Sequence, residues 1–384
     1  MNFRPNPPLV PRLFVPKEWM RGRKCPNLEI EPFLGFRMIT RRWILSIMPV
    51  IPAVIFHYFL MGQSLSQAAS LNPVQSLAAL TAADKAELAE ALRLKKVIGD
   101  QVWPGFSGAD IPIILYNDRH EFLMGAENPG DPWEVVEGDD FLGRHYFRRA
   151  AKDPQAFAVS IGAHWAGSIG TLDWMNGKIP FKFSPDFHLA LILHEVFHAY
   201  QADLVPARFA KALAVYKSES RYPYKDKEFA DAWNSEGAAL SEALRVADDA
   251  AARRSIRKFL QIRDARRERA ALGPDLVAYE SELEWLEGLA KFAEIRFYES
   301  TALRAGETPI VSYRPGLPPY LGWDFIRLEK QLGLQQSDLR FYLSGMAQAR
   351  LLDRLSPAWK AGANLDKIDL EDLLRAVVGL EKKN

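Results

Sequence analysis

The stretch with the clearest capacity for chemistry runs from Leu189 to Gln201 and reads LALILHEVFHAYQ. It contains an H-E-x-x-H motif, in which His194 and His198 are four residues apart and Glu195 follows the first. The stretch has no Gly or Pro, so it can be helical, and residues four apart on a helix lie on one face. Both imidazoles can therefore bind one metal ion. Zinc suits two imidazoles plus a carboxylate, with a fourth position for water. The pKa of that water falls to ~7, and Glu195 can reach it as a general base.

A third ligand must come from elsewhere in the chain. The metzincin pattern needs a Gly and a His where this sequence has Gln201 and Leu204, so that pattern is excluded. The best candidate is Glu287 in residues 284–294, EWLEGLAKFAE. These residues resemble the W-L-x-E-G-x-A-x-aromatic-x-E signature of gluzincin aminopeptidases and related peptidases, in which the Glu before Gly is the third zinc ligand.

Two departures from the gluzincin pattern are visible. One residue is missing between Leu286 and Glu287, and Glu287 lies 89 positions after His198, a much longer spacing than in the gluzincins. The chain thus resembles a gluzincin with a long helical insertion. The resemblance implies one Zn(2+) ion per chain bound by His194, His198 and Glu287, with Glu195 as the general base for peptide hydrolysis. It also implies an α+β fold, a predominantly helical zincin-like domain with a small N-terminal sheet beside the metal-binding helix.

Other residues could take part in this site. Glu284 shares a helical face with Glu287, and Glu236 lies in a second E-G-x-A sequence, so both are alternative metal ligands. An oxyanion donor could be Tyr342, Tyr320 or Tyr313, and His164 is a further candidate that we interpret as a loop histidine. Gly288 is costly in a helix interior by ~1 kcal/mol, which indicates that another element packs closely there.

Two further functions are compatible with the same residues. The zinc could serve hydrolysis of a non-peptide amide or ester, since the motif does not distinguish the scissile bond. Alternatively, the domain could be a catalytically inactive zincin-like binding or scaffold protein outside the cytoplasm. The intact motif argues against the latter, because loss of Glu195 or of a ligand is the usual result of degeneration.

The segment before the motif is predicted to contain both helix and strands. Residues 81–100 are expected to form a helix capped by Thr81, with Pro104 and Gly105 after its end. Strands are expected at 111–116 and 157–161, separated by a Gly- and Pro-rich loop at 125–140. The glycines of 162–171 indicate a turn or a close backbone approach. We expect the strands of 157–171 to lie beside the metal-binding helix, where an edge strand can pair with extended substrate.

The chain after the motif is expected to be almost wholly helical. Long stretches without Pro predict helices at 206–217, 228–249, 250–270, 275–300 and 324–354, with a loop at 302–323. The third helix carries a run of basic residues, which we interpret as a solvated face: Arg253, Arg254, Arg257, Lys258, Arg263, Arg266, Arg267 and Arg269. This run could pair with the acidic residues Glu280, Glu282, Glu284 and Glu294.

The N-terminal region predicts where the protein is located. Residues 1–37 are Pro- and Arg-rich and are expected to be disordered or a mis-assigned start. Residues 38–69 read as a signal peptide or membrane anchor, because two arginines precede the uncharged stretch 43–61 and Ser66-x-Ala68 follows. We therefore expect residues 70–205 to be the N-terminal α/β part and 206–384 the helical C-terminal part of a periplasmic, secreted or membrane-anchored catalytic domain.

Charge and cysteine content exclude some classes of protein. The formal net charge is +1, of which residues 1–42 contribute +6, so the body is mildly acidic and does not favour nucleic-acid binding. The chain has 48% hydrophobic residues, enough for a sizeable core. Its one cysteine is Cys25, so the body has neither a disulfide framework nor a thiolate metal site.

Overall fold

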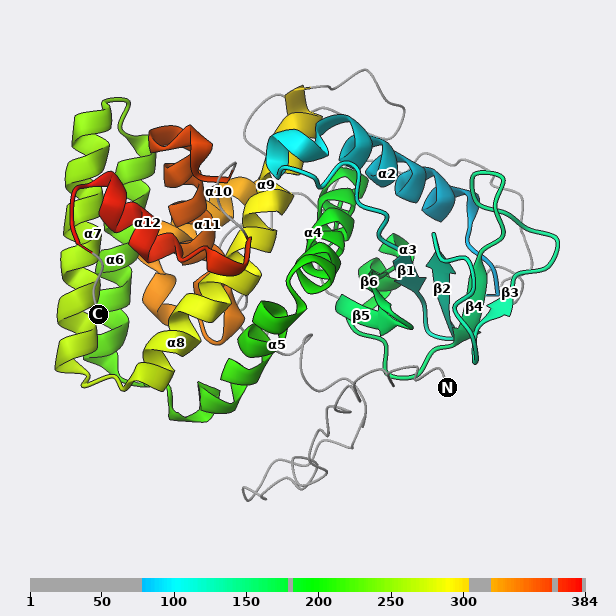
Figure 1. Ribbon diagram of the computed structural model, residues 1–384, viewed down its shortest axis with the longest axis horizontal. Helices are drawn as coiled ribbons and strands as arrows, with labels where there is room; N and C mark the ends of the chain where they lie inside the picture. The colour runs from blue at the N-terminus through cyan, green and yellow to red at the C-terminus, as the bar shows by residue number, and fades with distance from the viewer. Residues whose placement is uncertain (1–77, 179–181, 304–318, 361–364, 382–384) are drawn as a thin grey trace, which may run out of the picture. The chain divides into compact units, whose positions relative to one another are not determined.

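The computed structural model describes residues 78–178, 182–303, 319–360 and 365–381 (Figure 1). The chain separates into two compact units, Met1–Arg37 and Met38–Asn384, and all described residues belong to the second. The predicted disordered segment 1–37, the predicted signal or anchor segment 38–69 and Tyr313 lie outside the described residues. Within the described ranges, no helix is long and apolar enough to span a bilayer.

The N-terminal part contains a long helix and a six-stranded mixed sheet. Helix α2 (Ala82–Val102) begins at the predicted cap, where Thr81 and Asp84 form a capping box. The strands are β1 (Ile113–Tyr116), β2 (His120–Met124), β3 (Glu134–Val135), β4 (Phe147–Ala150), β5 (Phe157–Ile161) and β6 (His164–Gly170). Their order is β3-β4-β2-β1-β6-β5, with β1 and β6 parallel and the other pairs antiparallel.

The predicted strands β1 and β5 are present, whereas β2 and β4 were not expected from the sequence. Residues 162–171 contain both a turn and a strand. Gly162, with a φ of +60°, turns the chain between β5 and β6, and β6 occupies most of the remaining residues. Gly167 makes the expected close approach. A Cβ at this position would lie 2.6 Å from the backbone nitrogen of Val196, so only Gly lets β6 pack directly against the motif helix.

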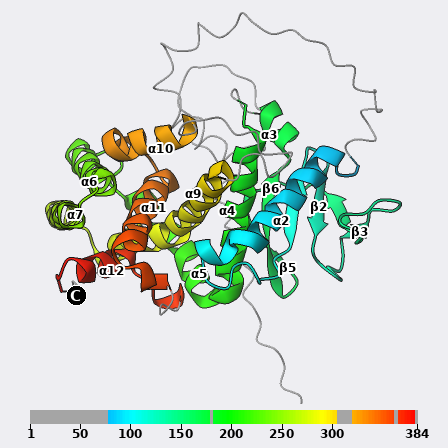
Figure 2. The same cartoon turned by 90° about the horizontal axis from the view of Figure 1, so that it is seen from above.

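Helix α4 (Pro185–Leu204) carries the H-E-x-x-H motif through the middle of the domain. Ser184 caps its first turn and Pro185 occupies a position where no backbone donor is needed. The residues from His188 to Ala202 are all buried, so the helix has no solvent face over this length. The two views place α4 between β6 on one side and α9 (Leu289–Leu303) on the other (Figures 1 and 2).

Among its described residues, the C-terminal part contains helices and connecting segments and no strand. Its elements are α5 (Pro206–Ala214), η5 (Val215–Arg221), α6 (Lys227–Arg245), α7 (Asp249–Arg269), α8 (Pro274–Leu283), the π-helical segment η6 (Glu284–Gly288), α9, α10 (Pro319–Lys330), η7 (Leu332–Leu334), α11 (Asp338–Leu355), η8 (Pro357–Lys360), η9 (Leu365–Lys367) and α12 (Leu370–Val377). The short helix α3 (Leu172–Lys178) precedes α4. The molecule is thus predominantly helical with a small sheet, as predicted.

Two predicted boundaries in this part were wrong. The loop expected at 302–323 overlaps two helices: α9 runs to Leu303, and α10 begins at Pro319, a residue suited to a first helical turn. Residues 304–318 lie outside the described residues. The helix expected at 324–354 is two α-helices, because residues 331–337 hold only the short 3-10 helix η7 and Ser337 has a φ of +53°. Helix α12 was not expected from the sequence.

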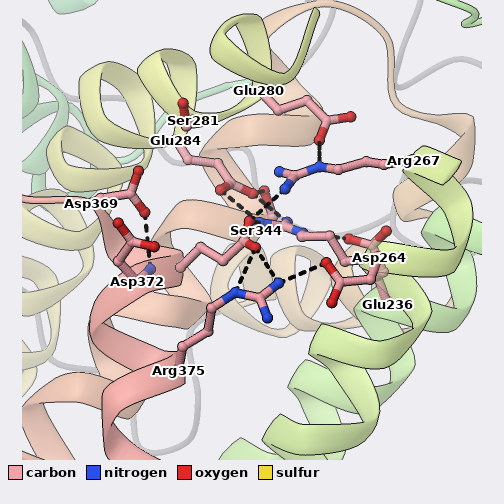
Figure 3. A network of polar contacts seen from close by, with 12 residues as sticks. Glu236, Asp264, Arg267, Glu280, Ser281, Glu284, Ser344, Asp369, Asp372 and Arg375 are labelled. Carbon is pink, nitrogen blue, oxygen red and sulfur yellow. Dashed lines mark hydrogen bonds and ion pairs between the residues drawn. The ribbon is translucent and has the colours of Figure 1, made fainter. Parts of the chain in front are cut away.

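The basic run on α7 does not form the solvated face that the sequence suggested. Arg263 is 0% exposed and Arg266 is 1% exposed, and both enter a buried ionic network with acidic residues of α6, α8 and η6. Figure 3 labels these acidic residues, Glu236, Glu280 and Glu284. Arg263 lies 2.9 Å from Glu236 and 2.6 Å from Glu284, and Arg266 lies 2.6 Å from Glu280. The expected pairing of this run with Glu280 and Glu284 is therefore present. Because each buried charge has a partner, the network fixes α6, α7 and η6 against one another.

The other two acidic residues expected to pair with that run have different partners. Glu282 lies 2.9 Å from Arg208 and 2.7 Å from Lys211, both on α5. Glu294 lies 2.9 Å from Nδ1 of His194 and 2.7 Å from Lys291.

Candidate metal centre

The three motif residues of α4 converge in the interior. His194 is 3% exposed, Glu195 is 8% exposed and His198 is 0% exposed. One ligand atom from each residue lies within 4.8 Å of the other two, and the Nε2 atoms of the two histidines are 3.1 Å apart. The spacing of four residues has brought the imidazoles to one face, as expected from helical geometry.

Glu287 approaches the same point from the facing helix. Its Oε2 lies 3.2 Å from Nε2 of His198, and the residue is 2% exposed. Tyr216 on η5 donates a hydrogen bond of 3.1 Å to the other oxygen, Oε1. Tyr342 also hydrogen-bonds this carboxylate. Among the described residues, Oε2 has no partner that meets full hydrogen-bond geometry, which is costly for a buried carboxylate oxygen. The carboxylate is therefore oriented with one oxygen fixed by a tyrosine and the other directed at the histidines.

The outer nitrogens of both histidines face hydrogen-bond acceptors. Nδ1 of His194 lies 2.9 Å from a carboxylate oxygen of Glu294, and Nδ1 of His198 lies 3.1 Å from Oε1 of Gln201. The amide of Gln201 is oriented by its own donation to the carbonyl of Trp285 at 3.0 Å, which leaves Oε1 for the histidine. Both Nδ1 atoms must therefore carry the proton, so in the neutral imidazoles both Nε2 atoms present lone pairs.

With both imidazoles neutral, three lone pairs meet at this point: two from the Nε2 atoms and one from Oε2 of Glu287. Such an arrangement is repulsive unless a proton or a metal cation lies between them. Ligands of a tetrahedral ion at 2.0–2.2 Å are about 3.3–3.6 Å apart, close to the 3.1 Å and 3.2 Å separations here. The pKa of His194 is lowered, mainly because the side chain is buried. A lowered pKa favours the neutral imidazole, which is the form that binds metals. The donor set therefore fits a divalent ion such as zinc.

A glycine contact places Glu287 at this distance. A Cβ on Gly288 would lie 2.5 Å from Cα of Gly345 on α11, and a Cβ on Gly345 would lie 2.5 Å from the carbonyl oxygen of Glu284. The two backbones touch because neither residue has a side chain. The close packing predicted at Gly288 is thus present, and the π-helical turn η6, a feature common at functional sites, presents Glu287 inward.

Glu195 has the electrostatic character of a base. Burial raises the pKa of its carboxyl group well above the usual range, and the neighbouring charges of Glu287 and Glu294 raise it further. A carboxylate with a raised pKa accepts a proton more readily near neutral pH than an exposed one. Its position beside His194 puts it next to the proposed metal position.

The alternative ligands lie elsewhere. Glu236 and Glu284 are both bonded to the guanidinium group of Arg263, and Glu284 also accepts a 2.6 Å hydrogen bond from Ser344 (Figure 3). A carboxylate held by an arginine in the interior is not available to a metal at the histidines. The geometry therefore selects Glu287 among the carboxylates that the sequence offered.

The candidate oxyanion donors lie in different parts of the structure. The ring of Tyr342 on α11 stacks on His194 with centroids 5.4 Å apart, so this tyrosine is at the site. Burial, and then the charge of Glu287, raises its pKa well above the usual range, so the hydroxyl stays protonated. Tyr320 lies in the first turn of α10. His164, which we interpreted as a loop histidine, is the first residue of strand β6; its side chain is 72% exposed and lies 3.8 Å from Asp203.

Three contributing residues were not recognised in the sequence: Glu294, Gln201 and Tyr216. Gln201 was considered only as a mismatch to the metzincin pattern. Glu294 was considered as the last residue of the gluzincin-like signature and as a partner for basic residues, but not as a partner of His194. A signal for Glu294 was present, because it lies seven residues after Glu287 and so on the same helical face. For Tyr216 the sequence contains no such signal, since its contact depends on how η5 packs.

The edge of the sheet lies beside these residues. Strand β5 is last in the strand order, and its Phe157 packs on His198 with ring centroids 4.7 Å apart. The expectation that the 157–171 strands lie beside the metal-binding helix is therefore met. No family model, curated protein or solved structure matches this chain, and its chemistry is inferred from the geometry above.

Proposed function

We propose that this protein is a zinc-dependent hydrolase that cleaves peptide bonds. The single observation that carries the proposal is the convergence of three buried ligand atoms: Nε2 of His198 lies 3.1 Å from Nε2 of His194 and 3.2 Å from Oε2 of Glu287. The adjacent Glu195 extends the proposal from metal binding to catalysis. A mixed sheet packed against the motif helix, with the third ligand on a later helix, supports a gluzincin-like, zincin-type arrangement.

His194, His198 and Glu287 would hold a zinc ion, whose positive charge would acidify a water molecule and polarise a scissile carbonyl. Glu195 would accept a proton from the attacking water and deliver it to the departing amine. Tyr342 stacks on His194, and its protonated hydroxyl is hydrogen-bonded to Glu287. If it exchanges that carboxylate for the developing oxyanion, it can stabilise the negative charge. Glu294 and Gln201 fix the tautomers of the two histidines.

The sheet edge supports a peptide as the substrate. Strand β5 pairs with β6 along one side only within the described residues, so its other edge offers backbone donors and acceptors. An extended peptide can add to such an edge by main-chain hydrogen bonds, which are independent of its side chains. Phe157 places this edge next to His198, so a peptide lying along it would pass the proposed metal.

The test is hydrolysis of a peptide library by zinc-loaded protein, with Glu195→Gln as the matched control. We expect the parent to cleave and the variant to bind zinc but lose at least about 10²-fold in rate, the contribution of a general base. Cleavage of small esters or non-peptide amides, without peptide cleavage, would favour the alternative hydrolase. Zinc binding without any hydrolysis, and with no effect of Glu195→Gln, would favour an extracytoplasmic binding protein.

A further inference from the structure

A row of buried charged residues leads away from the proposed metal site toward α10. Glu294 contacts Nδ1 of His194 through Oε2, and its other oxygen accepts a 2.7 Å hydrogen bond from the ammonium group of Lys291. The same ammonium group lies 2.8 Å from Oδ2 of Asp324 on α10. Exposure is 1% for Glu294, 5% for Lys291 and 4% for Asp324. We call Glu294, Lys291 and Asp324 the charged row.

The charged row begins on the helix that also carries the third ligand. Glu287, Lys291 and Glu294 are spaced by four and three residues, which places them along one face of η6 and α9. Lys291 is therefore one turn beyond the ligand and one turn before the residue that orients His194. Lys291 thus lies on the same helical face as the proposed ligand Glu287 and as Glu294, the residue that contacts the ligand His194.

The contacts assign a distinct task to each member of the row. Glu294 can orient the His194 ring only if its own carboxylate plane is fixed, and Lys291 fixes it by holding the second oxygen. Two carboxylates flank the single ammonium, so Asp324 draws Lys291 to a position between the two helices. A buried lysine that contacts two acids is strongly localised, because any other position would leave charges unpaired in a low-dielectric interior.

We propose that Lys291 and Asp324 are positioning residues of the metal site: they hold Glu294 so that His194 presents Nε2 to the metal. This inference rests on the proposed zinc site. It adds that the ligand geometry depends on the docking of α10, a helix that contributes none of the three ligands. Partners of metal-bound histidines typically change metal affinity by 10–100-fold when they are removed.

The experiment measures zinc affinity by competition with a chromophoric chelator, and ligand geometry by the visible absorption of the Co²⁺-loaded protein. The variants are Lys291→Met, Asp324→Asn, the double variant, and Lys291→Arg. The double variant removes the charges of Lys291 and Asp324 together. It therefore leaves no unpaired buried charge at position 324 and can fold even if Lys291→Met alone is unstable. Lys95→Met is the matched control, since Lys95 is also 5% exposed but bonds to the Ala109 carbonyl, remote from the histidines.

We expect Lys291→Met and the double variant to bind zinc about 10–100-fold more weakly and to change the Co²⁺ spectrum. Asp324→Asn should have a smaller effect of the same kind, and Lys291→Arg should retain most of the affinity. Lys95→Met should lower the melting temperature and leave zinc affinity and spectrum as in the parent. A folded double variant that keeps the zinc affinity and the Co²⁺ spectrum of the parent would overturn this inference but leave the proposed zinc site in place. A parent that binds no zinc would overturn both.

Discussion

The crossing of η6 and α11 at Gly288 and Gly345 gives the sharpest structural prediction. In Gly288→Ala the new Cβ would lie 2.5 Å from Cα and 2.9 Å from the carbonyl carbon of Gly345, and 3.1 Å from the carbonyl oxygen of Phe341. All three neighbours are backbone atoms, so no side chain can rotate away. Carbon atoms in contact prefer about 3.5–4.0 Å, so the helices must separate by about 1 Å.

This separation should affect both stability and the metal site. Overpacking of a well-packed interior costs about 1–3 kcal/mol, and the backbone contacts here favour the upper part of that range. Glu287 precedes Gly288 directly, so a 1 Å shift moves the third ligand by more than the ~0.5 Å that a preorganised site tolerates. We expect Gly288→Ala to lose about 2–3 kcal/mol in urea unfolding and at least about 10-fold in zinc affinity.

The control is Gly177→Ala on α3, where a Cβ would meet no atom within 4 Å. A helical Gly→Ala change without steric conflict should raise the free energy of unfolding by about 0.5–1 kcal/mol and leave zinc affinity unchanged. The reasoning is refuted if Gly288→Ala is as stable as the parent and binds zinc equally well. Loss of stability alone, with parental zinc affinity, would refute the link between the crossing and the ligand.

Three further predictions concern the site and its support. Glu195→Gln should keep zinc and lose at least about 10²-fold in kcat, measured with any cleaved peptide. Tyr342→Phe should also keep zinc, because Tyr216 still holds Glu287, and lower kcat by about 10²-fold if its hydroxyl binds the oxyanion. Burial alone would raise the pKa of Glu371, but Arg267 and Arg263 lower it to about 2 from 4.5. A pKa that is lowered in the folded state stabilises the fold above pH 4.5. The free energy of unfolding, measured by urea titration, should therefore fall by about 3 kcal/mol as the pH falls toward 2. Glu371→Gln should make the free energy of unfolding depend less on pH.

The local features of the site were predictable because they depend on short spacings. The four-residue spacing of His194 and His198 sets their common face whatever surrounds them, and Gly288 next to Glu287 indicated a close contact before its partner was known. The cap at Thr81 was predictable for the same reason, since it depends on residues three apart.

Features that depend on packing were not predictable in this way. The basic run of α7 has ordinary helical spacing, and nothing local shows that Arg263 and Arg266 face an interior lined by acids of α6 and α8. Strands β2 and β4 have mixed polarity, with Arg148 and Arg149 on β4, because they lie in the half of the sheet away from α4. Tyr216 and Asp324 reach the site only through the packing of η5 and α10 against distant elements.

The measurement that tests the central claim most directly is the zinc content of the purified protein, by elemental analysis, for the parent and for Glu287→Ala. Glu282→Ala is the matched control, because Glu282 is also buried on the same helical run but pairs with Arg208 and Lys211. We predict about one zinc per chain in the parent and in Glu282→Ala, and loss of zinc in Glu287→Ala. A parent that binds no zinc when supplied with it, or a Glu287→Ala variant that keeps parental zinc, would contradict the proposed site.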